Sequence, residues 1–152
     1  MTKLEYIYPD NVNEIDERGR TALMIAANEG QLDRVIKLVE LGADINIQND
    51  DGWSALLASR TAEVANFLIE NGADINAVSR SQFNSLMMAS VIGSKNLVSY
   101  LIKRGISIHS QTEGGWTPLL QAVSSGNLDV VSYIVEQGAV STCRMSVDGL
   151  PY

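Results

Sequence analysis

Apolar and polar residues follow a pattern that repeats along the chain. A short segment with apolar residues at helical spacing is followed by a second apolar segment that ends at a glycine. A polar, turn-rich stretch then leads into the next copy. Because residues three and four positions apart share one face of a helix, each copy predicts two short helices joined by a turn.

The copies recur at a fixed spacing. The leucine near the start of the first predicted helix recurs as Leu23, Leu56, Leu86 and Leu119. The period is about 33 residues, and the second copy is three residues shorter because it has no counterpart of the glycine after the first helix. We place the four repeats at residues 16–48, 49–78, 79–111 and 112–143, between an N-terminal extension, 1–15, and a tail or partial fifth repeat, 144–152.

Helix start signals agree with this register. Each first helix is preceded by a residue that is a good N-cap, and the four are Thr21, Ser54, Asn84 and Thr117. The second helices are predicted at 32–40, 62–70, 95–103 and 128–136. One such pair cannot bury its apolar face alone, so neighbouring pairs must stack, and we expect Leu119 to face the core between repeats.

The first repeat differs from the inner ones in its second helix. Arg34 and Lys37 stand where the inner repeats have aliphatic and aromatic residues. A terminal repeat has no neighbour on one side and turns polar there, so we expect both side chains to be exposed.

The repeat resembles the ankyrin repeat, whose period it follows. It also follows the T-P-L-H-x-A signature except at the His, which is Met24, Leu57, Met87 and Leu120 here. The match is carried by Thr21-Ala22-Leu23-Met24-Ile25-Ala26-Ala27, by Thr117-Pro118-Leu119-Leu120-Gln121-Ala122 and by two copies of Gly-Ala-Asp-Ile-Asn. The resemblance implies an all-α, ankyrin-type solenoid of four stacked helix-turn-helix repeats joined by short β-hairpin-like loops. One departure is Gln82, which replaces the usual hairpin glycine of the third repeat.

Composition and charge narrow the possible partners and locations. The 152 residues carry 11 basic and 18 acidic side chains, for a net charge of −7, which makes nucleic acid an unsuitable partner. No apolar stretch is long enough to cross a membrane, and the first residues lack the apolar run of a secretory signal. We therefore expect a cytoplasmic protein that binds neither nucleic acid nor membrane.

Residues that could carry chemistry are few. His109 is the only histidine and Cys143 the only cysteine, and neither lies in a metal-binding or nucleophile motif. The run Asn49-Asp50-Asp51-Gly52 collects carboxylates on a turn but lacks the order of a calcium loop. We predict no catalytic residue, no metal and no cofactor.

A binding surface is better supported. Arg20, Trp53, Phe83 and Trp116 each stand directly before an N-cap, and partly exposed aromatic side chains are common interface anchors. The resemblance implies that hairpin tips and the concave face of the first helices bind other proteins. We add the apolar pair Val91 and Ile92, and a polar rim of Asp50, Asp51, Arg80 and Glu113. In the alternative interpretation the rings pack on neighbouring hairpins, and Val91 and Ile92 are buried.

The predicted function is a non-catalytic protein-binding module, expected to be monomeric. One alternative is an inhibitor or immunity-type protein that occludes a basic enzyme or toxin, since an acidic chain would steer toward such a target. A second alternative is a self-assembling structural protein, in which the apolar face of the last repeat pairs two chains.

Overall fold

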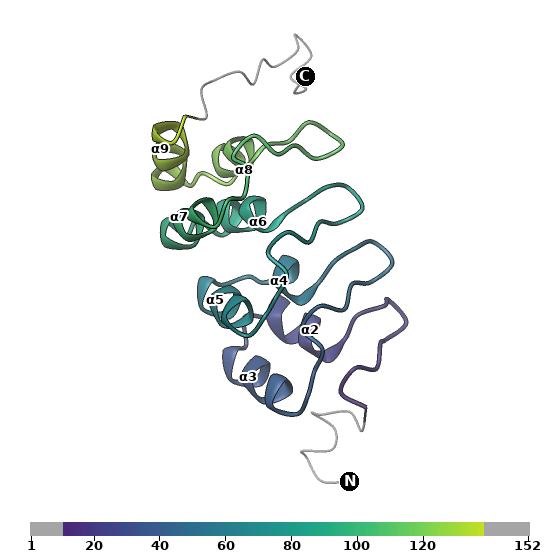
Figure 1. Ribbon diagram of the computed structural model, residues 1–152. Helices are drawn as coiled ribbons and strands as arrows, with labels where there is room; N and C mark the ends of the chain where they lie inside the picture. Colours follow the sequence, from purple (N-terminus) through teal and green to yellow (C-terminus); the bar gives the residue numbers. More distant parts are fainter. Residues whose placement is uncertain (1–10, 139–152) are drawn as a thin grey trace. The chain divides into compact units, whose positions relative to one another are not determined.

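The computed structural model describes residues 11–138, and the chain forms two compact units that divide between Ser79 and Arg80. The described residues contain eight helices, which form consecutive pairs (Figure 1). The predicted tail, residues 144–152, lies outside the described residues, as do Cys143 and the first ten residues of the predicted extension.

Unit 1 holds the first two helix pairs. Their bounds are α2 Ala22–Asn28, α3 Leu32–Glu40, α4 Ala55–Ala58 and α5 Ala62–Glu70. Helix α2 packs on α3 and α4, and α5 packs on α4 and α3, so first helices and second helices form two layers. Leu23, Val35 and Leu38 fill the space between the layers and are at most 1% exposed.

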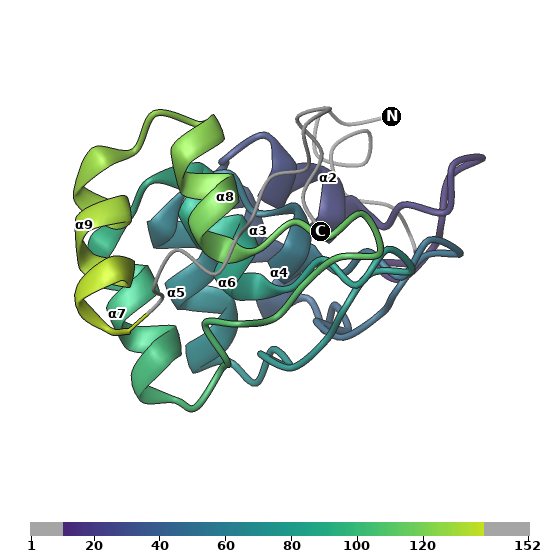
Figure 2. The ribbon, with the colours of Figure 1, turned by 90° about the horizontal axis from the view of Figure 1, so that it is seen from above.

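Unit 2 repeats the same arrangement with α6 Ser85–Ile92, α7 Lys95–Lys103, α8 Pro118–Ser124 and α9 Leu128–Glu136. Helix α6 packs on α7 and α8, and α9 packs on α8 and α7. Seen from above, α6 and α8 form one row of this unit and α7 and α9 the other (Figure 2). The second helices of the four described pairs all have the predicted bounds.

The first helices begin where the caps predict. The side-chain oxygens of Thr21, Ser54, Asn84 and Thr117 accept hydrogen bonds from the backbone N–H groups of Met24, Leu57, Met87 and Leu120 at 3.0–3.4 Å. Each such bond satisfies one of the donors that a helix start leaves without an intrahelical partner. The caps therefore fix the point at which each hairpin loop becomes a helix.

The missing residues of the second repeat shorten its first helix. Helix α4 has four residues, whereas α2 and α8 have seven and α6 has eight. Its C-cap is Ser59, whose Oγ donates to the Ala55 carbonyl at 3.0 Å. The next residue, Arg60, donates its backbone N–H to Ala27 O and its Nε to Asn28 Oδ1, both at 3.3 Å. Bonds to α2 thus replace the missing turn.

Two expectations about the end repeats need correction. Leu119 is half-buried, although Leu23, Leu56 and Leu86 at the same repeat position are at most 1% exposed. The reason is that no described helix pair follows α9 to cover it. Lys37 is exposed as expected, but Arg34 is half-buried, because its side chain folds back toward Gln31 and Glu29.

Gly93 gives a test of how closely α6 and α9 approach. Its φ is +82°, and a Cβ placed there would lie 2.6 Å from Asn127 Oδ1. Asn127 itself donates through Nδ2 to the carbonyls of Ser90 at 2.7 Å and Val91 at 3.0 Å. Gly93→Ala should therefore combine left-handed strain, about 1–2 kcal/mol, with displacement of a bonded side chain.

The matched control is Gly105→Ala. Gly105 has a φ of +95°, but a Cβ there would meet nothing within 4 Å. Only the backbone strain should appear in its free energy of unfolding. Denaturant unfolding of both variants measures the difference, and equal losses would show that the Asn127 contact gives way at no cost.

Candidate functional site

The first hairpin of unit 1 is held by an ion pair. Arg20 Nη2 and Nε lie 2.7 and 2.9 Å from Asp16 Oδ2, while Asp16 Oδ1 accepts the backbone N–H groups of Arg18 and Arg20 at 2.9 Å. The side-chain hydrogen bond from Arg20, followed by the backbone one, holds the pKa of Asp16 below its ordinary value of 3.8. Arg20 is thus half-buried and already paired within its own turn.

This pairing predicts a pH dependence confined to acid. A carboxyl whose pKa is lower in the folded chain stabilises the fold above its unfolded pKa, and the contribution is lost as the pH falls through the folded value. We expect the Asp16 carboxyl resonance to titrate below 3.8, and Asp16→Asn to remove that acid-limb dependence from hairpin stability. A carbon-detected NMR titration of the chain measures the first; an Asp16 midpoint at or above 3.8 would contradict the geometry.

The second hairpin presents a tryptophan beside two carboxylates. Asn49 Oδ1 accepts the backbone N–H groups of Asp51 at 3.0 Å and Trp53 at 2.9 Å, which fixes the turn. Asp50 and Asp51 are exposed at its tip, and Trp53 is half-buried. Within residues 11–138 neither of these two carboxylates forms an ion pair. The tip therefore carries uncompensated negative charge next to an aromatic surface.

In unit 2 the third and fourth hairpins are joined to each other. Glu113 N–H donates to Ser81 O at 2.9 Å. Gln82 has a left-handed φ of +67°, close to the +73° to +80° of Gly19, Gly52 and Gly115 in the other hairpins. The turn is therefore kept without glycine, at the strain that a side chain brings to this conformation.

The two aromatic residues of these hairpins differ in exposure. Phe83 is half-buried, whereas Trp116 is 38% exposed. Thr112 Oγ1 accepts the Trp116 N–H at 3.1 Å. The ring runs along Gly114, where a Cβ would lie 3.5 Å from Trp116 Cδ1. Trp116 is thus positioned by its own turn and presents one flank to solvent.

The apolar pair at the end of α6 is only partly covered. Val91 is 44% exposed and Ile92 half-buried, so the alternative in which both are buried is wrong for Val91. A hollow of about 270 Å³ lies close by, lined by Gly93, Gly126, Asn127, Leu128 and Asp129. Asn127 connects the two features, because it lines the hollow and binds the Val91 carbonyl. Of the remaining rim residues, Arg80 and Glu113 are exposed.

Loops after the second helices add rigidity to unit 1. Asn13 Oδ1 accepts the Asp44 N–H at 2.7 Å, and Asn46 Oδ1 accepts the Asp74 N–H at 2.8 Å. Asn46 Nδ2 also donates to Gly72 O at 3.0 Å. In unit 2 the residue at the repeat position of Asn46 is His109. It is exposed and donates its backbone N–H to Ser107 Oγ at 3.1 Å.

We also searched the part of the chain that the structure describes for a metal site and for a membrane-spanning helix. No group of three or more His, Cys, Asp or Glu residues is placed there to hold a metal ion. None of its helices is both long and apolar enough to cross a membrane. The hairpins and first helices present partly exposed side chains for contact with a partner, and hydrogen-bonding groups lie at the edge of this surface.

Sequence reasoning missed two features of the surface. The first is the distribution of charge: residues 80–138 carry Arg80, Lys95, Lys103 and Arg104 against Glu113, Asp129 and Glu136, so the acidic excess of the chain belongs to unit 1. Counting charges separately for each half would have revealed it. The second is the exposure of large aliphatic residues in the last repeat, Val123, Leu128 and Val135. The seven-residue spacing of Leu128 and Val135 within one predicted helix could have indicated a second apolar face.

Comparison with known proteins identifies a family for this chain. A family model described as ankyrin repeats, three copies, matches residues 2–79 and 58–145. This match, together with the helix pairs, confirms the predicted all-α, ankyrin-type solenoid class.

Two groups of curated relatives are also similar. The rat ankyrin repeat and SAM domain-containing protein 6 is 36% identical over 88 residues, which is 55% of this chain and 10% of that protein. The Notch-regulated ankyrin repeat-containing proteins of Xenopus tropicalis and human are each 46% identical over 56 residues, 37% of this chain and 46% of theirs. The matched segments thus span less than half the length of these relatives.

Proposed function

We propose that this chain, which belongs to the ankyrin repeat family, is a non-catalytic module that binds another protein through its hairpin tips and the concave side of its first helices. Ankyrin repeats are in general protein-interaction modules. The observation that carries the proposal is the set of partly exposed residues directly before the helix caps, Arg20 and Trp53 in unit 1 and Phe83 and Trp116 in unit 2.

Rigid presentation of these residues supports the proposal. The turns that carry Trp53 and Trp116 are tied by side-chain acceptors, Asn49 and Thr112, that bind the backbone N–H of each tryptophan. The residue after each tryptophan is the N-cap of a helix. A tryptophan whose backbone is held on both sides loses little backbone freedom on binding, so more of its contact energy appears as affinity.

The two units contribute different chemistry to this surface. In unit 1, Trp53 stands beside the exposed carboxylates of Asp50 and Asp51. In unit 2, Trp116 is accompanied by the apolar Val91 and Ile92 and by the opposite charges of Arg80 and Glu113. The expected partner therefore offers apolar groups to unit 2 and cationic or hydrogen-bonding groups to unit 1.

The acidic character of unit 1 favours one specific version of this function. An inhibitor or immunity-type protein that occludes a basic enzyme or toxin would gain association rate from the negative charge of that unit. Salt distinguishes the versions. Affinity that falls steeply with ionic strength indicates a basic target held by Asp50 and Asp51, whereas affinity that depends on the rings and little on salt indicates an aromatic anchor site.

The test is capture followed by titration. The chain is used to isolate partners from the lysate of its native host, with the Trp53→Ala/Trp116→Ala double variant as the control. A partner retained by the native chain and lost from a folded double variant supports the proposal. A partner retained equally by both would place binding elsewhere on the chain.

A further inference from the structure

Helix α9 has two apolar faces, and the described residues cover only one. Val130 and Ile134 are fully buried, and their neighbour Tyr133 faces α7, donating its Oη–H to Ser99 Oγ at 3.0 Å with Lys95 Nζ 5.7 Å from its ring centre. Leu128, Val131 and Val135 share another side of the helix, since they are three and seven positions apart. Leu128 is 75% exposed, Val135 is 49% exposed and Val131 is half-buried.

Helix α8 continues this second face. Val123 is 55% exposed and Leu119, four residues earlier, is half-buried. We call Leu119, Val123, Val131 and Val135 the terminal face; Leu128 lies at its edge.

The preceding repeat shows what normally packs on such a face. The residues of α6 and α7 that correspond to Leu119, Val123 and Val131 are Leu86, Ser90 and Val98, and all three have no exposed area. In unit 2 they belong to helices on which α8 and α9 pack. The terminal face thus has the form of a surface on which a helix pair stacks, and it is more apolar than its counterpart, because Val123 replaces Ser90.

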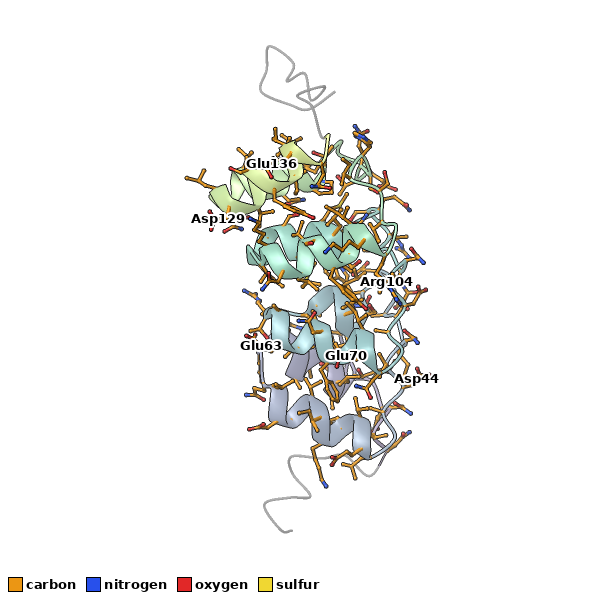
Figure 3. All side chains as sticks on the ribbon, turned by 60° about the vertical axis from the view of Figure 1, so that its left-hand side comes forward. Asp44, Glu63, Glu70, Arg104, Asp129 and Glu136 are labelled. Atoms are coloured by element: carbon orange, nitrogen blue, oxygen red, sulfur yellow. The ribbon has the colours of Figure 1, made fainter. Side chains whose placement is uncertain are left out.

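The charges around the two end repeats decide which surface of a second chain could occupy it. Asp129 and Glu136, at the two ends of α9, are the only ionised side chains of α8 and α9 (Figure 3). Helix α3 of the first repeat instead carries Arg34 and Lys37, with Lys37 Nζ 3.7 Å from Glu40 Oε2. Arg34 occupies the repeat position of Val130, which has no exposed area where α9 packs on the preceding helix pair. Stacking α3 on the terminal face would therefore bury the Arg34 charge among apolar side chains.

We propose that the terminal face pairs with the terminal face of a second copy, giving a two-fold dimer. An isologous contact of this kind places apolar residues against apolar residues on both sides and closes without further growth. Exposed apolar patches on otherwise polar proteins commonly mark such contacts. The proposal replaces the expected monomer by a concentration-dependent dimer, and it stands on residues that the partner-binding surface does not use.

Sedimentation equilibrium of the full chain over a wide range of concentrations tests the proposal. The native chain should shift from monomer to dimer mass as its concentration rises. The Val123→Asp/Val135→Asp variant should stay monomeric, with a dissociation constant raised at least ~100-fold, because each new carboxylate would be buried without a partner. Both positions are exposed in the single chain, so its circular dichroism spectrum and melting temperature should be kept.

Val91→Asp is the matched control. The exposed fraction of Val91, 44%, is close to the 49% of Val135, but Val91 lies on α6 outside the terminal face. This variant should keep the native self-association while weakening partner binding, and Val123→Asp/Val135→Asp should do the opposite. The failure of either proposal can therefore be told from the failure of the other.

Two results would overturn the dimer. One is a native chain that remains monomeric at every concentration, which is the outcome if residues 139–152 cover the terminal face from within the same chain. The other is a dimer whose mass is unchanged by Val123→Asp/Val135→Asp, which would place the contact on another surface.

Discussion

Leu86→Ala should lower the free energy of unfolding by about 2–5 kcal/mol, whereas Leu119→Ala should cost clearly less. Both residues occupy the same position of their repeats, the second residue of the first helix. Leu86 has no exposed area, while Leu119 is half-buried. Truncating a buried leucine removes its transfer free energy and leaves a cavity. A half-exposed leucine buries less area and leaves a space that solvent can fill.

Urea denaturation of both variants measures this difference, and a third substitution controls for helix propensity. Ser124→Ala lies at the exposed end of α8 and should change stability by less than ~0.5 kcal/mol. The comparison also bears on the dimer. If the terminal face is covered in a dimer, the cost of Leu119→Ala should grow with protein concentration, because association then adds to apparent stability. Equal costs for Leu86→Ala and Leu119→Ala at low concentration would contradict the burial difference between the two repeats.

The same pair of leucines shows what a repeating sequence can and cannot predict. The register, the caps and the bounds of the second helices follow from local rules: an N-cap residue, apolar spacing and a glycine at each end. Burial does not, because it depends on what lies beside a repeat. Leu119 has the same local sequence signal as Leu86, and only the lack of a following described helix pair makes it half-buried.

Arg34 shows the limit from the other direction. A charged residue at a position that is apolar in the inner repeats predicts an end repeat, but the exposure of its side chain depends on whether a nearby acceptor draws it back. Gln31 Oε1 lies 3.5 Å and Glu29 Oε2 3.8 Å from Arg34 Nη1. Sequence spacing alone does not reveal such a contact, because Glu29 lies in the turn after α2 rather than on α3.

The candidate site also has features that the sequence predicts and features that depend on neighbouring residues. The alignment of the repeats was enough to predict that the residue before each cap is partly exposed. The pairing of Arg20 with Asp16 could not, and it makes Arg20 a weaker anchor than the rings, since binding through its guanidinium must compete with a carboxylate 2.7 Å away. The flank of Trp116 also depends on a neighbour, the bare backbone of Gly114.

Trp53→Ala and Trp116→Ala should each weaken binding of the captured protein partner by ~2 kcal/mol or more, about a 30-fold rise in Kd. Partly exposed aromatic rings on rigid turns lose little entropy on binding and bring a large apolar area. The cost in stability should be smaller than the cost in affinity. Trp116, at 38% exposure, should show the wider gap, and Trp53, which is half-buried, the narrower one.

A thermal melt beside a titration on each variant separates anchoring from packing. If the rings stiffen the hairpins instead, the order reverses: stability falls by several kcal/mol, and affinity suffers only through the fraction unfolded. Arg20→Ala is the useful comparison, because it alters the same repeat position in a hairpin whose arginine is already paired. Its effect on affinity should be well below that of either tryptophan, and an equal effect would show that position in the repeat, rather than exposed aromatic area, determines binding.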